Sequence, residues 1–308
     1  MTEHIPVLIN EIVAFLKDRP GIKKVLDCTL GLGGYARAVL DAIPGSQVFG
    51  LDQDGEALQE AKNRLAHFGE RFKALGGNFA DAPELFGSEG PFDAILFDLG
   101  VSNLQISAGR RGFSFQHDGP LDMRMNPDSP FSARDIVNDA SDKELADIFW
   151  KYGEERYSRL IARGIVEKRR SGGGISTTGE LVALVREVLP APVQRKMGGH
   201  PARRIFQALR IAVNDELSVL ERGLAGAIGL VSAGGVIAVV SYHSLEDRIV
   251  KNRFRELQKE GRGTVITKKP VVPGKEEIEI NYKARSAKLR IFEAKGPGRE
   301  DGRDGEGK

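Results

Sequence analysis

Apolar runs alternate with amphipathic segments along the first hundred residues. Four runs of mainly apolar residues end abruptly at polar or glycine positions, which is typical of buried strands. They lie at about 24–29, 47–52, 72–79 and 92–98, and the third is the weakest. Apolar positions recur at helical spacing in residues 7–16 and 54–68. Strands that alternate with helices predict an α/β protein with a mostly parallel sheet and helices on both faces.

The pattern changes after Gln105. Residues 106–134 are rich in Gly, Arg, Asp and Pro and contain few regular elements. A loop of this length in a compact protein is usually functional or disordered, and its Phe and Met content argues against disorder. Residues 141–210 then show helical periodicity only, and Ser141 begins a capping-box pattern with Glu144. The segment is therefore expected to be a helical insertion.

The α/β pattern resumes beyond residue 211. Strands are expected at 234–242, 265–267 and 287–292, and Ser244 is placed to cap the helix after the first of them. The tail is rich in glycine and charge, which is typical of disorder. The expected domains are a discontinuous α/β domain at 1–105 and 211–295, an inserted loop and helical domain at 106–210, and a disordered tail at 296–308.

A strand, a glycine turn and a helix follow one another in residues 24–36. Gly31, Gly33 and Gly34 allow tight backbone conformations and a close approach of a ligand. The N–H groups that open the helix favour polar or anionic ligand groups. Asp52 ends the next strand about 20 residues later, where a carboxylate can accept both ribose hydroxyls. The pattern favours a nucleoside-containing cofactor over a plain turn, and it fits nicotinamide dinucleotides as well as S-adenosylmethionine.

Composition excludes several classes of protein. Of the 308 residues 41% are hydrophobic and 29% charged, which is typical of a globular protein. No apolar run reaches the length of a membrane span, and no signal peptide opens the chain. The one cysteine excludes an intrachain disulfide and a cysteine-rich zinc site. We therefore expect a cytoplasmic protein with no membrane partner and no metal.

Basic residues are concentrated in two stretches, although the net charge is only +2. Residues 151–210 and residues 248–290 each contain 13 Lys/Arg against 5 Asp/Glu, whereas residues 1–105 contain 9 against 15. Either stretch alone is most simply a solvated helix face. Two such stretches together with a nucleoside cofactor favour a nucleic-acid partner.

Ten segments distributed along the chain together resemble one family. They are His4-x-Pro-Val-Leu, Asp27-x-Thr-x-Gly-x-Gly-Gly, Asp98-Leu-Gly-Val-Ser, Arg111-Gly-Phe-Ser-Phe, Asp118-Gly-Pro-Leu-Asp-Met-Arg-Met, Tyr152-Gly-Glu-Glu-Arg, His200-Pro-Ala, Phe206-Gln-Ala-Leu-Arg, Ser241-Tyr-His-Ser-Leu-Glu-Asp-Arg and Arg285-Ser-Ala-Lys-Leu-Arg. They resemble the RsmH (MraW) family of bacterial small-subunit ribosomal RNA methyltransferases. The resemblance covers nearly the whole chain except the tail.

The resemblance implies a fold, an activity and a partner. The fold is the Rossmann-like sheet of S-adenosylmethionine (SAM) methyltransferases, interrupted by a helical domain that recognises RNA. The activity is methylation of N4 of one cytidine in the decoding region of 16S rRNA, and the partner is this rRNA in the small ribosomal subunit. A homodimer is also considered. By position in the motifs, the implied SAM contacts are Gly33, Gly34, Tyr35, Asp52, Phe79, Asp98 and Gln105.

The chain departs from the family pattern at three places. The family usually has His at the position of Tyr35, so a side-chain contact to SAM there is open. It usually has Ser-Ser-Pro-Gln where this chain has Ser102-Asn-Leu-Gln105, which leaves the placement of Gln105 open. It often has Pro where Tyr282 stands.

Several residues have two open interpretations. Asp98 is either the catalytic acceptor for N4 or a cofactor contact only, and His243 is either a base or an orienting group for the helix cap. Cys28 is expected to be a small buried residue. Phe113 and Phe115 either anchor the loop or stack on a base, and Asp122 and Arg124 either hold the loop or contact RNA.

Exposed cations suit contacts to RNA phosphates. The candidates are Arg203, Arg204, Arg210, Arg285, Lys288 and Arg290. Two other functions remain open at this point. One is a non-catalytic ribosome assembly factor that binds SAM, and the other is an NAD-dependent oxidoreductase, which lacks a recognisable hydride-transfer site.

Overall fold

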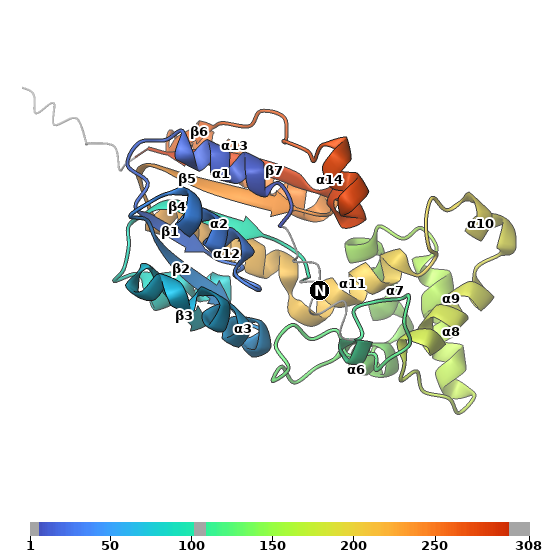
Figure 1. Ribbon diagram of the computed structural model, residues 1–308. Helices are drawn as coiled ribbons and strands as arrows, with labels where there is room; N and C mark the ends of the chain where they lie inside the picture. The colour runs from blue at the N-terminus through green and yellow to red at the C-terminus, as the bar shows by residue number, and fades with distance from the viewer. Residues whose placement is uncertain (1–5, 102–108, 296–308) are drawn as a thin grey trace, which may run out of the picture. The chain divides into compact units, whose positions relative to one another are not determined.

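The computed structural model describes residues 6–101 and 109–295. The chain divides into two compact units, Met1–Gly100 with Val219–Lys308, and Val101–Ser218 (Figure 1). The boundaries expected from the sequence, after residues 105 and 210, lie five and eight residues from these. The expected disordered tail and Gln105 both lie outside the described residues.

The first unit is built on a seven-stranded sheet in the order β3-β2-β1-β4-β5-β7-β6. The first five strands pair in parallel, and β7 is antiparallel to both β5 and β6. This confirms the mostly parallel sheet predicted from the sequence. The strands are β1 (Lys24–Asp27), β2 (Gln47–Asp52), β3 (Phe72–Gly76), β4 (Phe92–Asp98), β5 (Val231–Ser241), β6 (Gly263–Val265) and β7 (Lys288–Ala294).

Helices cover both faces of this sheet because successive strand residues point to opposite sides. Val25 belongs to one hydrophobic core and its neighbour Leu26 to the other, and the same holds for Leu96 and Ile95. The first core contains residues of α1 (Ile9–Lys17), α2 (Gly34–Ala42) and α3 (Gly55–Leu65). The second contains residues of α4 (Ala82–Phe86), α12 (Glu216–Leu230) and α13 (Ser244–Lys259).

The second unit packs its helices around a separate hydrophobic core. These helices are α6 (Ala133–Asp139), α7 (Asp142–Gly153), α8 (Ser158–Arg170), α9 (Thr178–Val188), α10 (Ala191–Lys196) and α11 (Arg203–Asn214). Ser141 and Glu144 form the capping box that the sequence predicted for α7. Helix α11 crosses α7 closely at Gly153, where a Cβ would lie 2.6 Å from the carbonyl oxygen of Arg204.

Two details of the first unit differ from the sequence prediction. The N-cap of α13 is His243 and not Ser244, because the His243 ring accepts from the N–H of Glu246 while the Glu246 carboxylate accepts from the N–H of His243. The prediction also lacked α14 (Lys275–Ile280), where only six residues are helical. Within the described ranges, no helix has both the length and the apolar content needed to cross a membrane.

The remaining short 3₁₀ helices connect these elements. They are η1 (Ala66–Arg71), η2 (Phe79–Asp81), η3 (Gly109–Arg111) and η4 (Tyr282–Ser286).

Candidate functional site

The turn between β1 and α2 requires glycine. Gly31 and Gly33 have φ values of 52° and 80°, which lie in the left-handed region that side chains disfavour. A Cβ on Gly33 would lie 2.7 Å from Cδ1 of Leu65, and one on Gly34 would collide with the ring of Pro6. Gly33 is also the N-cap of α2 and has no side chain to accept from the first-turn N–H groups. These amides can therefore serve a ligand.

Asp52 joins the end of β2 to this turn. Its Oδ2 accepts from the N–H of Gly31 at 2.7 Å, and its Oδ1 accepts from the N–H of Asp54 at 2.8 Å. Burial raises the pKa of Asp52 above its usual value, and these backbone hydrogen bonds act against that rise. The carboxyl is thus fixed against the glycine turn, and its remaining lone pairs can accept hydroxyl groups.

Phe79 lies beyond the end of β3, in η2. Its ring makes an edge contact with Phe97 at 5.4 Å between centroids, and it lies so close to Gly223 that a Cβ there would be 2.5 Å from Cδ2. The preceding Asn78 accepts from the N–H of Ala80 at 2.9 Å and so holds the turn. The half-buried ring is therefore fixed in place at the same edge of the sheet.

Asp98 ends β4 and belongs to a chain of hydrogen bonds. Its N–H donates to Oγ1 of Thr29 at 2.6 Å, and the hydroxyl of Tyr242 donates to its Oδ1 at 2.7 Å. The N–H of Thr29 donates in turn to Oδ1 of Asp27 at 3.2 Å. The ends of β1, β4 and β5 are thus connected through their side chains.

At these strand ends the buried Asp27 and the half-buried Asp98 have no cationic partner in the described parts of the protein. Burial raises the pKa of Asp27 to about 7, and the hydrogen bond from Thr29 opposes the rise. Burial likewise raises the pKa of Asp98 to about 7, against the hydrogen bond from Tyr242. Oδ2 of Asp27 is buried and has no hydrogen-bond partner among the described residues. Such a site favours a ligand that carries positive charge and N–H donors.

The structure brings together five of the seven expected cofactor contacts. Gly33, Gly34, Asp52, Phe79 and Asp98 all lie at or just beyond the carboxyl ends of β1 to β4, the edge where open α/β sheets bind ligands.

Tyr35 is placed differently. Its side chain is 4% exposed, and its hydroxyl donates to the carbonyl of Val7. Only its backbone faces the glycine turn. Gln105 lies outside the described residues.

Sequence reasoning assigned no role to three residues of this site. Asp27, Thr29 and Tyr242 all occur in motifs noted above, but their contacts link residues as far as 144 positions apart. The sequence feature that could have identified these residues is their position at or just after the ends of expected strands.

Cys28 and His243 are two further residues that could take part in catalysis. Cys28 is 3% exposed, as expected for a small core residue, and burial raises the pKa of its thiol well above the usual value. A thiolate nucleophile is therefore disfavoured. His243 caps α13, and its Nε2 lies 3.1 Å from Oε1 of Glu246. This geometry agrees with the orienting role.

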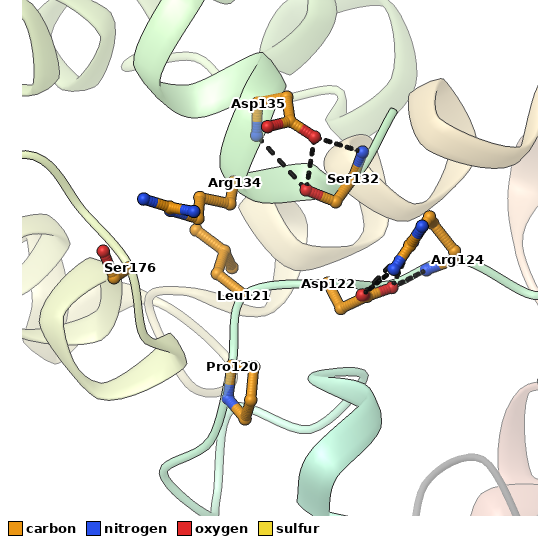
Figure 2. Close-up of a pocket in the computed structure, with 8 residues that line it drawn as sticks. All are labelled: Pro120, Leu121, Asp122, Arg124, Ser132, Arg134, Asp135 and Ser176. Atoms are coloured by element: carbon orange, nitrogen blue, oxygen red, sulfur yellow. Dashed lines mark hydrogen bonds and ion pairs between the residues drawn. The ribbon is translucent and has the colours of Figure 1, made fainter. Parts of the chain in front are cut away.

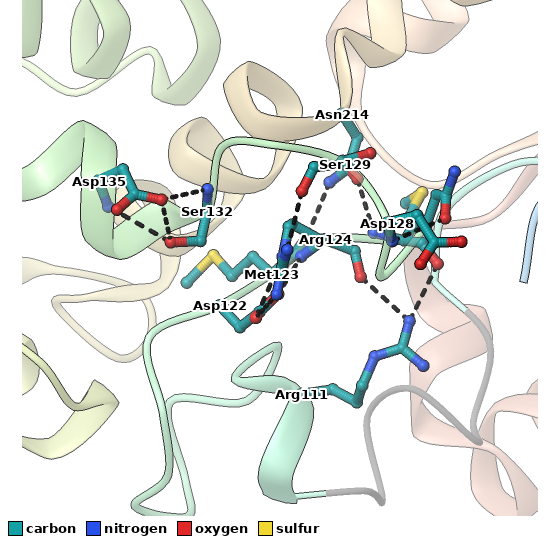
Figure 3. A network of polar contacts seen from close by, with 11 residues as sticks. Arg111, Asp122, Met123, Arg124, Asp128, Ser129, Ser132, Asp135 and Asn214 are labelled. Carbon is teal, nitrogen blue, oxygen red and sulfur yellow. Dashed lines mark hydrogen bonds and ion pairs between the residues drawn. The ribbon is translucent and has the colours of Figure 1, made fainter.

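The loop of the second unit is held by its own polar side chains (Figure 3). The guanidinium of Arg124 donates to both carboxylate oxygens of Asp122 and, through Nη1, to the carbonyl of Ser129 at 2.8 Å. Arg111 donates to the carbonyls of Arg124 and Met125. Of the two interpretations for Asp122 and Arg124, these contacts support holding the loop.

Beside this loop lies a cavity of about 300 Å³ (Figure 2). It is lined by Pro120, Leu121, Asp122, Arg124, Ser132, Arg134, Asp135 and Ser176. Asp135 is engaged in the capping box of α6 with Ser132, and its pKa is lowered mainly by the hydrogen bonds from that serine. Around the cavity, Arg124 therefore neutralises Asp122, and Ser132 occupies one carboxylate oxygen of Asp135.

Phe115 packs between two rings of the second unit. It stacks on His200 at 4.7 Å and makes an edge contact with Phe206 at 5.8 Å. Phe113 is half-buried against the same core. Both contacts favour the packing interpretation of these phenylalanines.

The six cations proposed for RNA differ in their surroundings. Arg210 forms two hydrogen bonds to Glu216, at 2.7 and 2.8 Å, and Arg290 is 7% exposed at its side chain and pairs with Asp247 at 2.6 Å. Arg203, Arg204 and Arg285 are exposed, and Lys288 is half-buried beside Asp247.

The mostly parallel sheet, the glycine turn and Asp52 define the class of an α/β protein that binds a nucleoside-containing cofactor. The comparison with known proteins makes this specific. The chain belongs to the MraW methylase family, which matches residues 1–295. A protein of Carboxydothermus hydrogenoformans named "Ribosomal RNA small subunit methyltransferase H" is 48% identical over 307 residues, which cover 94% of this chain and 97% of that protein.

Solved structures of low sequence identity also match. An rRNA methylase from Streptococcus thermophilus has a TM-score of 0.46 at 11% identity, covering 96% of this chain and 99% of that one. A methyltransferase from Streptococcus mutans, crystallised with SAH, has a TM-score of 0.46 at 12% identity, covering 94% and 99%. The family assignment rests on sequence and not on these structures. It replaces the oxidoreductase alternative, because the matched family is one of methylases.

The described residues fit SAM, the cofactor of this family. SAM carries a sulfonium and an ammonium group, and the site offers the carboxyls of Asp27 and Asp98, with one buried acceptor oxygen that has no partner in the described chain. The uncapped amides at the start of α2 and the Asp52 carboxyl suit its polar groups and its ribose.

Proposed function

We propose that the protein transfers a methyl group from SAM to N4 of a cytidine in the decoding region of 16S rRNA within the small ribosomal subunit. The observation that carries the proposal is the Asp98 carboxyl at the end of β4: the Tyr242 hydroxyl donates to this carboxyl, and Thr29 accepts from the backbone N–H of Asp98. Its Oδ2 has no hydrogen-bond partner in the described part of the chain. A carboxyl in this position can accept a hydrogen bond from an exocyclic amine.

SAM, when bound, supplies an activated methyl group on its sulfonium centre. The protein then has to orient the acceptor, and orientation alone contributes several kcal/mol to such reactions. The N4 lone pair of cytosine is delocalised into the ring. An acceptor at Asp98 that binds an N4 proton favours the localised, nucleophilic form. With a pKa of about 7, the same carboxyl can hold the released proton near neutral pH.

The proposed cofactor contacts follow from the geometry. The backbone N–H groups of Gly33, Gly34 and Tyr35 bind polar groups of SAM. Asp52 accepts hydrogen bonds from the ribose hydroxyls, and Phe79 provides an apolar face for the base of SAM. Gln105 stays a prediction from the sequence.

The proposal places RNA phosphates at the exposed cations. Arg203 and Arg204 open α11, and the Arg204 side chain is 47% exposed. Arg285 is exposed in η4. Arg210 and Arg290 are weaker candidates for phosphate contacts, because each is paired with a carboxylate and their side chains are only 16% and 7% exposed, respectively. Lys288, 39% exposed beside Asp247, stays a candidate. Arg203→Ala is expected to weaken RNA binding and to lower the salt dependence of binding by about one phosphate contact.

The decisive experiment is transfer of tritiated methyl groups from SAM to small ribosomal subunits isolated from cells that lack this protein, followed by nucleoside analysis. Label in N4-methylcytidine that is lost in Asp98→Ala supports the proposal. The matched control is Asp41→Asn, an exposed carboxylate of α2, which should retain activity.

Other outcomes would contradict the proposal. Label in a different nucleoside would keep the methyltransferase and reject the acceptor. SAM binding without transfer to subunits or to free rRNA would favour the non-catalytic assembly factor. The homodimer stays a prediction, which sedimentation of the purified protein tests.

A further inference from the structure

Tyr242 reaches Asp98 from the opposite end of the chain. It follows β5, and its hydroxyl donates to Oδ1 of Asp98 at 2.7 Å across a separation of 144 positions. Its ring lies against Gly100, where a Cβ would be 3.4 Å from Cδ2 of the ring. Its N–H donates to Oε2 of Glu246 at 2.8 Å, so the capping box of α13 fixes its backbone. Ring, hydroxyl and backbone are each held by a separate contact.

We propose that Tyr242 is a positioning residue whose hydroxyl orients the Asp98 carboxyl for methyl transfer. The inference rests on the proposed function, because it assigns Asp98 to the acceptor side of the reaction. It gives a role to the run Ser241-Tyr-His-Ser-Leu-Glu, which begins at the last residue of β5 at this edge of the sheet and had no assigned cofactor contact.

The electrostatic surroundings make this hydroxyl important. The ionisable groups with the largest effects on the pKa values of Asp98, of its partner Tyr242 and of Tyr35 on α2 are acidic. Besides these three residues themselves, they are Asp27 on β1, Glu246 on α13 and Glu277 on α14. Asp27 and Glu246 raise the pKa of Asp98 in addition to burial, whereas the Tyr242 hydrogen bond lowers it. Burial and Asp98 raise the pKa of the Tyr242 hydroxyl itself, which keeps it protonated as a donor.

The direction of the effect follows. Without the hydroxyl, the pKa of Asp98 rises further above its present value of about 7. An increase of about one pKa unit lowers the ionised fraction at pH 7 from about one half to about one tenth. The orientation of the Asp98 carboxyl is also no longer fixed, because Oδ1 has lost the hydrogen bond from the Tyr242 hydroxyl.

The test is Tyr242→Phe in the full-length protein, which keeps the ring against Gly100 and removes only the hydroxyl. The first readout is ¹³C NMR titration of the Asp98 carboxyl in cofactor-free protein, assigned with Asp98→Asn. The second is the pH profile of methyl transfer to small subunits. We expect the midpoint of the titration to rise by about one pH unit or more. Activity should fall severalfold at pH 7 and recover at higher pH.

Tyr157→Phe is the matched control, because this tyrosine is 37% exposed and lies in the other unit. It should change neither readout.

The two hypotheses fail differently. If Asp98→Asn retains full methyl transfer, the assignment of Asp98 in the proposed function is wrong. If Asp98→Asn is inactive but Tyr242→Phe leaves the Asp98 titration in place, the positioning role of Tyr242 is rejected while the proposed function stands. A loss of activity that is equal at every pH, with an unchanged titration, would likewise reject it and leave only a structural role. Thermal unfolding of Tyr242→Phe shows whether the variant is folded.

Discussion

The buried Asp27 carboxyl makes the stability of the cofactor-free protein depend on pH. Its Oδ1 accepts one backbone hydrogen bond, from Thr29, and its buried Oδ2 has no partner in the described chain. Asp27→Asn keeps the size of the side chain and the acceptor oxygen but cannot ionise. Comparison of this variant with the wild type therefore measures the free energy of ionising Asp27 within the folded protein, together with the effect of its charge on Asp98.

The magnitude follows from the pKa. Burial raises the pKa of Asp27 from 3.8 to about 7. Well below pH 4 the Asp27 carboxyl is protonated in both the folded and the unfolded protein, so it makes no pH-dependent contribution to the free energy of unfolding. Between pH 4 and 7 the unfolded chain ionises while the native protein keeps the proton, so stability falls as pH rises and then levels off. Roughly three pKa units at about 1.4 kcal/mol each correspond to about 4 kcal/mol.

The assay is urea unfolding of cofactor-free protein at pH 4, 5, 6, 7 and 8. The free energy of unfolding of Asp27→Asn, relative to the wild type, should rise by several kcal/mol from the lowest to the highest pH. Asp41→Asn is the control, because its side chain is 58% exposed and its curve should run parallel to that of the wild type. A difference between Asp27→Asn and wild type that is constant with pH would refute the reasoning.

Three further substitutions test the glycines and the ribose site. Gly33→Ala should cost about 1–3 kcal/mol in urea unfolding, because φ is 80° and the new Cβ meets Leu65; unchanged stability would contradict this. Gly153→Ala should lower Tm by several degrees, because its Cβ meets the backbone oxygen of Arg204, which cannot move without shifting α11; an equal Tm would reject the packing argument. Asp52→Asn should weaken SAM binding in calorimetry at least tenfold, since a charged acceptor for two hydroxyls is lost; an unchanged Kd would remove Asp52 from the site.

The sheet was largely predictable because its central strands are apolar on both faces. β2 and β4 begin and end where the sequence predicted, since the apolar residues before Asp52 and before Asp98 stop at an aspartate in each strand. The order of the strands was not predictable from these runs. β5 extends back to Val231, across Gly234 and Gly235, because its pairing with β4 continues to Phe92 with an irregularity. The glycines interrupt both the apolar pattern and the regular pairing with β4, which jumps from Val236 to Val231.

The cap of α13 shows a second limit of local patterns. Ser244-x-x-Asp247 resembles a capping box, and so does His243-x-x-Glu246 one residue earlier. The structure selects the second, because Asp247 is occupied by Arg290 and Lys288 of β7. The choice depends on a strand about forty residues away, so it cannot be read from the helix itself.

The same dependence on distant partners explains which site residues the sequence could identify. The glycine turn and Asp52 form a local unit, so spacing alone indicated them. Asp98 could be identified as a strand end, but its electrostatic state depends on Asp27 and Tyr242, which the sheet order places beside it. A count of basic residues gave equal weight to Arg203 and Arg290, although Arg203 is exposed and Arg290 is buried. Charge and spacing in the sequence indicate which residues are chemically suited to the site. The side-by-side arrangement of β1, β4 and β5 decides which of these residues form hydrogen bonds with one another.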